Sequence, residues 1–549
     1  MAAPLAGIET TLHLLKRWRH SAAGDVLLAA SFASHPRVRI GALRTLVRRE
    51  DPAAHAKLIA DSDGLDEESR RELIEAPEGG ALRKAVQRAI SSSDASLSRQ
   101  ACRLASEGRM LDALPAVVKA ARQFSVSVAA GHAEAALLLA KELHGEIALR
   151  RRGKRGRLQS DPAFLRRAAL VELGEALDQY DLHRRDELIE AFLLLTAHDS
   201  PTMLRVIHNP RHAGHEPLLN ALRDSPTHAA WELVARSLED RTAPAALLEV
   251  AAQRTDRSFV ESLLTEVGSP VGIRTLDNAK KIDRFAWLAA EHREALYTMR
   301  GDAQAAALQL GAASQMPREE LAGVAFDMLS HGAPEGRLAA VLALDSVPPS
   351  ECAEPLLTAA ADSDPHVASA AAQRLRKKKH PQAMPILLSM LESRSSTVRK
   401  AAQRALPEVN FIRYRDQYDG LSEEHRRDIG ELVGKADARA AQRLRQEFAA
   451  GAVSRRLRAL EMTEAMGYVD QVRSDLMRLM EDSDLGVRAE AARVLGSGRL
   501  DADTLVALDV RRDDVSAEVR KTAAESADRL RALDAAQSMI DELQQEFDP

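Results

Sequence analysis

Residues 150–157 form a dense cluster of positive charge. Six of these eight residues are cationic, and Gly153 and Gly156 separate them. Guanidinium and ammonium groups on such a loop can grip the phosphates of a nucleic acid, a nucleotide or an anionic lipid. A solvated loop between helices is the alternative interpretation, and no aromatic residue is interleaved to stack on bases. The candidate anion-binding residues are Arg150, Arg151, Arg152, Lys154, Arg155 and Arg157.

A second candidate for chemistry is the densest histidine run of the chain, which consists of His198, His208, His212, His215 and His228. A metal site needs three or more ligands that converge on one point, and the central three histidines could supply them from one helix. Pro210 and Gly214 favour a loop instead, and the sequence has no HExxH arrangement. We therefore predict no metal site here.

Motifs for enzyme catalysis are missing from the sequence. It contains no GxGxxG or GxxxxGK(S/T) phosphate cradle and no GxSxG nucleophile elbow. Cys102 and Cys352 are the only cysteines and lie far apart, so we expect neither a disulfide framework nor a cysteine-rich zinc site. Acidic pairs such as Asp482 and Asp484 suit helix capping. We predict that the chain is not an enzyme and has no catalytic residue and no cofactor.

The composition describes a mixed, solvated surface. The 549 residues carry a formal net charge of −5, and 29% of them are charged. The chain as a whole therefore has no net positive charge that would attract it to nucleic acid or to an anionic membrane. Aromatic residues make up only 3%, and Ala and Leu dominate the apolar content. No basic N-terminal region precedes an apolar segment, and no apolar run is long enough to span a bilayer. We predict a cytoplasmic protein without a signal peptide or membrane span.

The elements that must position these groups are helices in a repeating unit. Residues 353–406 contain two copies, in which an Asp- or Ser-rich turn leads into a Val, paired alanines and a Leu. The anchors Val367 and Val398 lie 31 residues apart, and an apolar helix that opens with Pro355 or Pro385 precedes each copy. The Asp or Ser can cap the helix, the Val can reach the core, and alanines allow close helix approach.

The same pattern recurs along the chain. Val487 and Val519 lie 32 residues apart. Weaker copies of the repeat occur at nearly the same spacing across residues 331–530. Further copies begin at His35 and at Asp161. The Arg that follows the anchor Val can lie across the turn toward an acidic residue of a neighbouring repeat. A second motif, Asp-Gly-Leu followed by an acidic helix start, occurs at residues 63–74 and 419–429 and could serve as a docking edge.

At these residues the chain resembles HEAT-like repeats, in the short form that also occurs in phycobilin lyases. The tetratricopeptide pattern and the ankyrin T-P-L-H signature are absent. The resemblance implies an all-α fold, a right-handed, armadillo-like helical solenoid of stacked helix-turn-helix units. Residues 374–379 carry a second basic cluster at the end of a repeat helix, where positive charge is favoured, so we interpret it as structural.

We predict five regions from this pattern. They are N-terminal repeats that end in a long helix (1–150), the basic loop (151–160), degenerate helical repeats (161–330), regular repeats (331–530) and a C-terminal capping or partner helix (531–549). The last helix is expected from about Ser516 to Phe547. Its apolar stripe consists of Val519, Ala523, Leu530, Leu533, Ile540, Leu543 and Phe547. Its second half either folds back as a cap, which we favour, or projects as a handle for a partner or a second copy of the chain.

The predicted function is a non-enzymatic scaffold that binds another protein, whose identity the sequence does not name. The alternative is a solenoid that binds nucleic-acid backbone through the basic loop and an arginine-rich concave face. Arginine far outnumbers lysine, which suits bidentate contacts to phosphate. A lyase or DNA glycosylase built on a HEAT-like fold is a third candidate, from fold analogy alone.

Overall fold

The computed structural model describes residues 6–75, 80–123, 126–151 and 161–547. Within these residues the chain forms 34 α-helices and seven short 3-10 helices, and no strand. The all-α prediction is therefore confirmed. No helix in the described part of the chain combines the length and the apolarity needed to cross a membrane. The chain divides into two compact units, Met1–Val324 and Ala325–Pro549, which are described separately below.

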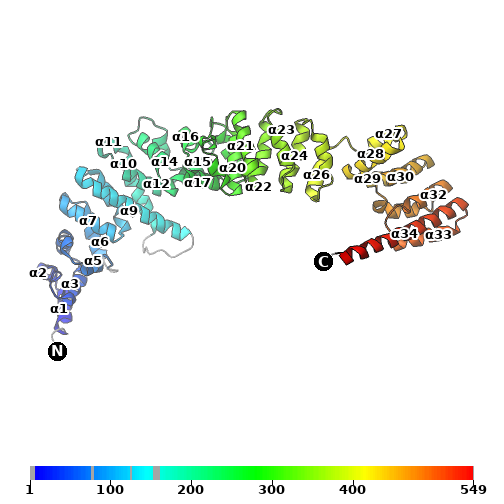
Figure 1. Cartoon of the computed structure of the whole chain (residues 1–549). Coiled ribbons are helices and arrows are strands. Elements are labelled where there is room, and N and C mark those ends of the chain that lie inside the picture. The colour runs from blue at the N-terminus through cyan, green and yellow to red at the C-terminus, as the bar shows by residue number, and fades with distance from the viewer. Residues whose placement is uncertain (1–5, 76–79, 124–125, 152–160, 548–549) are drawn as a thin grey trace. The chain divides into compact units, whose positions relative to one another are not determined.

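The N-terminal unit contains the first twenty helices (Figure 1). Their bounds are α1 Ala6–Arg17, α2 Ser21–Ala30, α3 Pro36–Val47, α4 Pro52–Ala60, α5 Glu67–Glu75, α6 Gly80–Ile90, α7 Ala95–Glu107, α8 Leu114–Gln123, α9 Val126–Arg151, α10 Pro162–Asp178, α11 Tyr180–His183, α12 Asp186–Leu195, α13 Pro201–Ile207, α14 His215–Asp224, α15 His228–Ser237, α16 Ala245–Gln253, α17 Arg257–Val267, α18 Ile273–Ala279, α19 Glu294–Tyr297 and α20 Gly301–Ala313. Helix α21, Arg318–His331, spans the boundary between the two units.

The C-terminal unit contains the remaining helices. They are α22 Pro334–Ala343, α23 Ala353–Ala360, α24 Pro365–Lys377, α25 Ala383–Met390, α26 Ser396–Ala405, α27 Phe411–Gln417, α28 Glu423–Ala436, α29 Ala440–Phe448, α30 Val453–Ala465, α31 Arg473–Leu479, α32 Leu485–Leu495, α33 Ala502–Val510 and α34 Ala517–Phe547. The 3-10 helices of the chain are η1 Ser62–Gly64, η2 Leu111–Ala113, η3 Ala286–Leu288, η4 Leu344–Ser346, η5 Tyr418–Gly420, η6 Asp470–Val472 and η7 Arg511–Asp513.

Helices of both units stack in two rows. In the N-terminal unit α2, α4, α6, α8 and α10 follow one another in one row, and α7, α9, α12, α15 and α17 follow one another in the other. In the C-terminal unit one row consists of α22, α24, α26, α28, α30, α32 and α34. The helices α23, α25, α29, α31 and α33 lie in the other row, and each packs against the helix that follows it in the chain. Each helix therefore contacts mainly its neighbours, as expected for an α-solenoid.

The anchor residues of the repeat occupy the predicted places. Asp364 caps α24 by accepting hydrogen bonds from the N–H groups of His366 (2.8 Å) and Val367 (3.1 Å). Asp484 does the same for α32 with Gly486 (2.9 Å) and Val487 (3.1 Å). Both valines are fully buried. Capping thus fixes where the helix begins, and the start of the helix fixes which side chain enters the core.

Removing one cap tests its contribution to stability. We expect Asp484→Ala to lower the free energy of unfolding by about 1 kcal/mol, because two N–H groups at the start of α32 lose their acceptor. Asp484→Asn keeps an acceptor oxygen and should lower the free energy of unfolding by only a few tenths of a kcal/mol. Urea denaturation followed by circular dichroism measures both, and equal losses for the two variants would contradict a capping role.

An arginine–aspartate ladder links some successive repeat turns, as predicted for Arg488, whereas Arg399, which follows Val398, donates only to carbonyl oxygens of its own turn. Each arginine follows the turn before a repeat helix and binds the aspartate of the next turn, with nitrogen–oxygen distances of 2.7 to 3.1 Å. The same guanidinium holds its own turn: Arg488 donates to the carbonyl oxygen of Asp482 (2.9 Å). The pairs are Arg337–Asp362, Arg456–Asp482 and Arg488–Asp514.

The Asp-Gly-Leu motifs have a structural role in both places. Each forms a 3-10 turn, η1 or η5, before an acidic helix start. Asp63 pairs with Arg103 (Oδ1–Nη1, 2.8 Å), and Asp419 pairs with Arg458. In both cases the arginine lies on a later helix of the same unit. The motif therefore ties a turn to a following repeat, and its expected role as a docking edge stays a prediction.

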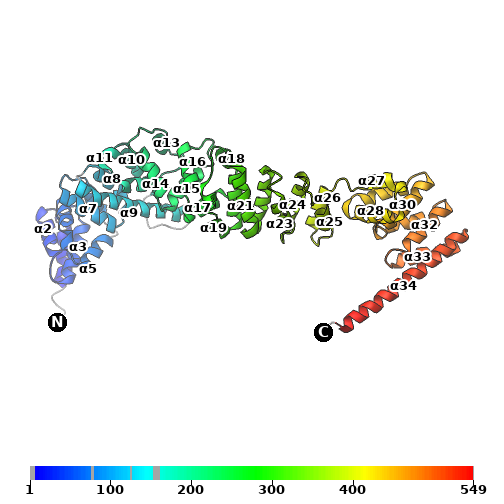
Figure 2. The same ribbon diagram turned by 45° about the horizontal axis from the view of Figure 1, so that its top comes forward.

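Helix α34 is continuous from Ala517 to Phe547 (Figure 2). Val519, Ala523 and Leu530 are buried, and the helix packs on α32 and α33. From Arg531 to Ala536 every residue is exposed, and the side chains beyond Ala536 lie outside the described part. These observations fit a projecting second half better than the folded-back cap that we favoured from the sequence.

Candidate binding groove on helix α10

The basic loop leads from the end of α9 to the start of α10. Asp161 caps α10 by accepting a hydrogen bond from the N–H of Ala163 (3.1 Å), and Arg150 at the end of α9 lies 3.6 Å from the same carboxylate. Arg151 ends α9, but its side chain is not among those described. The other candidates, Arg152, Lys154, Arg155 and Arg157, lie outside the described residues. Anion binding by this loop therefore stays a prediction.

The solvent-facing side of α10 exposes two large apolar side chains. Phe164 is 67% exposed and Val171 is 59% exposed. They are seven residues apart, which places them two turns apart on one face of the helix. Arg167, between them, is also exposed and forms no ion pair with any described residue. Single exposed apolar residues are common, but two in line on one helix face mark a candidate contact surface.

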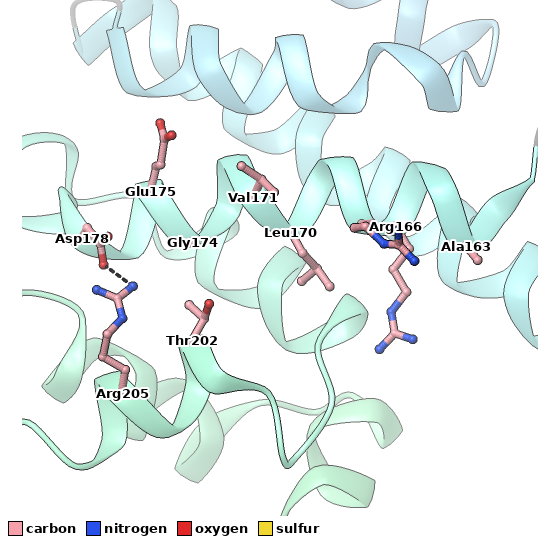
Figure 3. Close-up of a pocket in the computed structure, with 10 residues that line it drawn as sticks. Ala163, Arg166, Leu170, Val171, Gly174, Glu175, Asp178, Thr202 and Arg205 are labelled. Carbon is pink, nitrogen blue, oxygen red and sulfur yellow. Dashed lines mark ion pairs between the residues drawn. The ribbon is translucent and has the colours of Figure 1, made fainter.

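A groove runs beside this face, between α10 and α13 (Figure 3). Its volume is about 580 Å³. Gly174 lines it next to Thr202 of α13. The lining residues are Ala163, Arg166, Arg167, Leu170, Val171, Gly174, Glu175, Asp178, Thr202 and Arg205.

The acidic residues of the groove are already paired with basic side chains. Asp178 Oδ1 binds Arg205 Nη2 and His212 Nε2, each at 2.9 Å, and Figure 3 shows Arg205 reaching toward it. Glu175 pairs with Arg122 Nη1 at 2.8 Å. Arg167, which forms no ion pair with a described residue, therefore adds a positive charge to the lining of the groove.

A second cavity, here called the histidine cavity, adjoins the groove and shares Arg166 with it. Its volume is about 310 Å³. Side chains from α9, α12 and α15 line it, together with the turn after α12. The lining residues are His144, Ile147, Ala148, Arg166, Leu193, Leu194, Thr196, Ala197, His198, His228, Ala229, Glu232, Leu233 and Arg236.

Comparison with known protein families identifies the type of helical repeat in the C-terminal part of the chain. Residues 324–407, which span α21 to α26 and include the two copies read from the sequence, match the family of HEAT repeats. This part of the chain consists of HEAT repeats. The groove on α10 and the histidine cavity lie outside the matched residues, in more divergent repeats of the N-terminal unit.

Solved structures with similar helical repeats are distant. One comes from work on a phosphorylation switch that controls the interaction between cadherin and beta-catenin; it has 15% identity and a TM-score of 0.31, and covers 92% of this chain and 99% of its own. Yeast importin-beta (Kap95p) has 13% identity, a TM-score of 0.25 and coverages of 94% and 85%. Kap121p bound to Ste12p has 14% identity, a TM-score of 0.24 and coverages of 94% and 54%. No curated protein matches significantly.

The histidines of the dense run bind separate partners among the helices of the N-terminal unit. His198 Nε2 lies 3.3 Å from Asp240, His212 binds Asp178, and buried His215 donates from Nδ1 to the carbonyl oxygen of Val206 at 3.0 Å. Among the described residues no group of three or more His, Cys, Asp or Glu is placed to hold a metal ion. Sequence reasoning did not find the cavity that His198 and His228 help to form, because helix packing brings His144 and Arg166 to them.

The second basic cluster is structural, as predicted. Arg374 is buried and its Nη2 binds Asp345 at 2.8 Å, while Lys377 binds the other oxygen of that carboxylate at 3.1 Å. Arg376 pairs with Glu408 at 2.8 Å. The cluster therefore ties the end of α24 to its two neighbouring repeats.

Proposed function

We propose that this HEAT-like repeat protein is a scaffold that binds a segment of another protein on the α10 face. The observation that carries the proposal is the exposed pair Phe164 and Val171 beside the groove. Apolar side chains in line next to a concave surface are the arrangement that accepts the apolar face of a partner helix. A segment that presents apolar side chains would cover both residues and place its polar groups against the arginines.

A non-enzymatic role is part of the proposal, and the candidate nucleophiles support it. The fully buried pair Ser98 and His132 (Oγ–Nε2, 2.9 Å) lies out of reach of a substrate. Burial raises the pKa of the Cys102 thiol to about 12, so it stays protonated and unreactive near neutral pH. Burial also raises the pKa of Cys352, which lies inside the C-terminal unit. None of these groups combines access with activation.

Affinity purification with matched variants tests the docking surface. We expect the tagged wild-type chain, purified from cells that express it natively, to retain a partner that Phe164→Ser/Val171→Ser loses by about tenfold or more, because two apolar anchors are removed. Ile273→Ser is the control, since Ile273 is 79% exposed in the same unit but away from the groove. Recovery of the same proteins by all three forms would contradict the proposal.

A second candidate function is phosphate binding by the basic loop. Its support is the position of Arg150 beside the start of α10, where Arg166 also lines a hollow of about 370 Å³. We expect affinity for single-stranded nucleic acid, measured by fluorescence anisotropy, to fall steeply with salt and to vanish when all six cationic loop residues become Gln. Binding that is absent at low salt, or that persists in the Gln variant, would exclude this function.

A further inference from the structure

Helix α1 exposes two large apolar side chains at the end of the N-terminal unit (Figure 1). Leu14 is 62% exposed and Trp18 is 60% exposed. The N–H of Trp18 donates to the carbonyl oxygen of Leu14 at 3.0 Å, so the two residues lie one turn apart on the same helical face. Because Trp has one of the largest apolar surfaces of any side chain, its exposure beside Leu14 marks a candidate contact surface.

The opposite face of α1 is fixed to the rest of the unit. The helix packs on α2 and α3, and Leu12 lies so close to Gly41 of α3 that an added Cβ would come 2.6 Å from Leu12 Cδ1. The buried side chain of Arg49 binds the end of the helix, because its Nη1 donates to the carbonyl oxygens of Leu15, at 2.8 Å, and of Trp18. This packing holds the exposed face of α1 outward.

Three cations without acidic partners surround the last turn of α1. Lys16, Arg17 and Arg19 are exposed, and their side chains form no ion pair with a described residue. Glu9, the only acidic residue in the described helix α1, lies in its first turn. Asp25 of α2 is already paired with a lysine of α4 at 2.8 Å. The surface around the end of α1 is therefore locally positive, although the whole chain has a formal net charge of −5.

We propose that Leu14, Lys16, Arg17, Trp18 and Arg19, here called the α1 patch, bind the surface of an anionic lipid bilayer. The three cations contact the negatively charged headgroups. The indole of Trp18 lies at the boundary between headgroups and acyl chains, where aromatic residues of membrane proteins gather, and Leu14 adds apolar area beside it. This inference goes beyond the proposed function and does not rest on it, because the α1 patch shares no residue with the α10 face.

The composition of the α1 patch favours a bilayer over the other partners that an exposed basic surface can have. A second copy of the chain would bring three more cations against these three, and repulsion between like charges opposes that contact. A nucleic acid would use the cations and could stack a base on Trp18, but Leu14 would gain nothing from phosphates. An anionic bilayer offers negative charge at its surface and apolar groups beneath it, so it uses all five residues.

Co-sedimentation of the full chain with lipid vesicles tests the inference. The vesicles contain either phosphatidylcholine alone or equal parts of phosphatidylcholine and phosphatidylserine. We expect binding to the phosphatidylserine vesicles only, and a loss of binding as salt rises. Each cation near an anionic surface changes the affinity about fivefold, so Lys16→Gln/Arg17→Gln/Arg19→Gln should weaken binding about a hundredfold. Leu14→Ser/Trp18→Ser should weaken it about tenfold or more, because both apolar contacts are removed.

Matched controls change the same kinds of side chain elsewhere in the N-terminal unit. Arg257→Gln/Arg274→Gln/Arg284→Gln removes three exposed cations and alters the net charge of the chain by the same amount. Leu182→Ser/Ile273→Ser removes two exposed apolar side chains. Vesicle binding by both controls should stay within about twofold of the wild type.

Fluorescence quenching by brominated phosphatidylcholine tests whether Trp18 enters the bilayer. Bromine on the acyl chains quenches an indole that lies among them. Of the three tryptophans, Trp287 is buried and Trp231 is half-buried, so Trp18 is the exposed indole. We expect quenching of the vesicle-bound wild type and its loss in Trp18→Phe, which keeps an aromatic ring and should still bind the vesicles.

Five results would overturn the inference. Binding to phosphatidylserine vesicles that is absent at low salt, or that equals binding to phosphatidylcholine vesicles, would contradict an anionic lipid site. Equal losses in the cation variant and its matched control would mean that only net charge matters. Loss confined to the variant in which all six cations of the basic loop become Gln would assign lipid binding to that loop. Displacement from the vesicles by an equal concentration of single-stranded DNA, without quenching of Trp18, would assign the α1 patch to nucleic acid.

Discussion

The substitution Val487→Asp is expected to lower the free energy of unfolding of the C-terminal unit by about 4 kcal/mol. Val487 is 0% exposed at the start of α32 and belongs to a core that runs from Phe411 to Leu530. A carboxylate at this position loses its hydration and finds no cation in the apolar contact between α30, α32 and α34. Urea denaturation followed by circular dichroism measures the loss.

Val515→Asp is the matched control for this prediction. Val515 precedes α34 in the same unit and is 91% exposed, so the same chemical change leaves the carboxylate in water. We expect its effect on the free energy of unfolding to stay within about 0.5 kcal/mol. Similar losses for the two variants would mean that Val487 does not occupy the core between repeats.

The second large effect is expected from the arginine–aspartate ladder. Arg488→Met should lower the free energy of unfolding by about 3 kcal/mol, because the Asp514 carboxylate, whose side chain is 5% exposed, loses its two hydrogen bonds from Arg488 and keeps only Arg511 Nη1 at 4.0 Å. The double variant Arg488→Met/Asp514→Leu removes both charges and should regain most of that loss. Thermal or urea unfolding of the four forms completes the cycle, and equal destabilisation by the single and double variants would argue against an ion pair.

The ladder also predicts a dependence of stability on pH. Hydrogen bonds from Arg488 hold the pKa of Asp514 below its ordinary value of 3.8. A carboxylate with a lowered folded-state pKa contributes stability above the unfolded-state pKa, and this contribution is lost as pH falls through the folded-state pKa. The stability difference between the wild type and Arg488→Met should therefore be largest above about pH 4 and shrink at lower pH.

The repeat could be predicted from the sequence because its signals are local. An Asp before a helix caps that helix whatever lies around it, and a Val three residues later must then face inward. The ladder was predictable for the same reason, since its arginine and aspartate occur at fixed positions in consecutive turns. The period of about 31 residues adds the information that neighbouring copies stack.

The groove on α10 could not be predicted in the same way. Phe164 and Val171 lie on a helix whose other apolar residues, such as Leu165 and Leu173, are buried. Sequence periodicity does not tell which apolar face a neighbour covers, and the histidine cavity depends on contacts between helices far apart in the sequence. For α34 we favoured a folded-back cap from the apolar stripe, yet residues 531–536 are all exposed, and local periodicity does not tell whether the chain folds back on itself.

Hydrogen exchange of the Val487→Asp variant, followed by mass spectrometry, tests most directly whether each helical repeat is held by its neighbours. We predict faster exchange in α30, α32 and α34, the helices in contact around Val487, and wild-type exchange throughout the N-terminal unit. Accelerated exchange of equal size in both units would contradict the repeat architecture, because it would require one cooperative core shared by the whole chain.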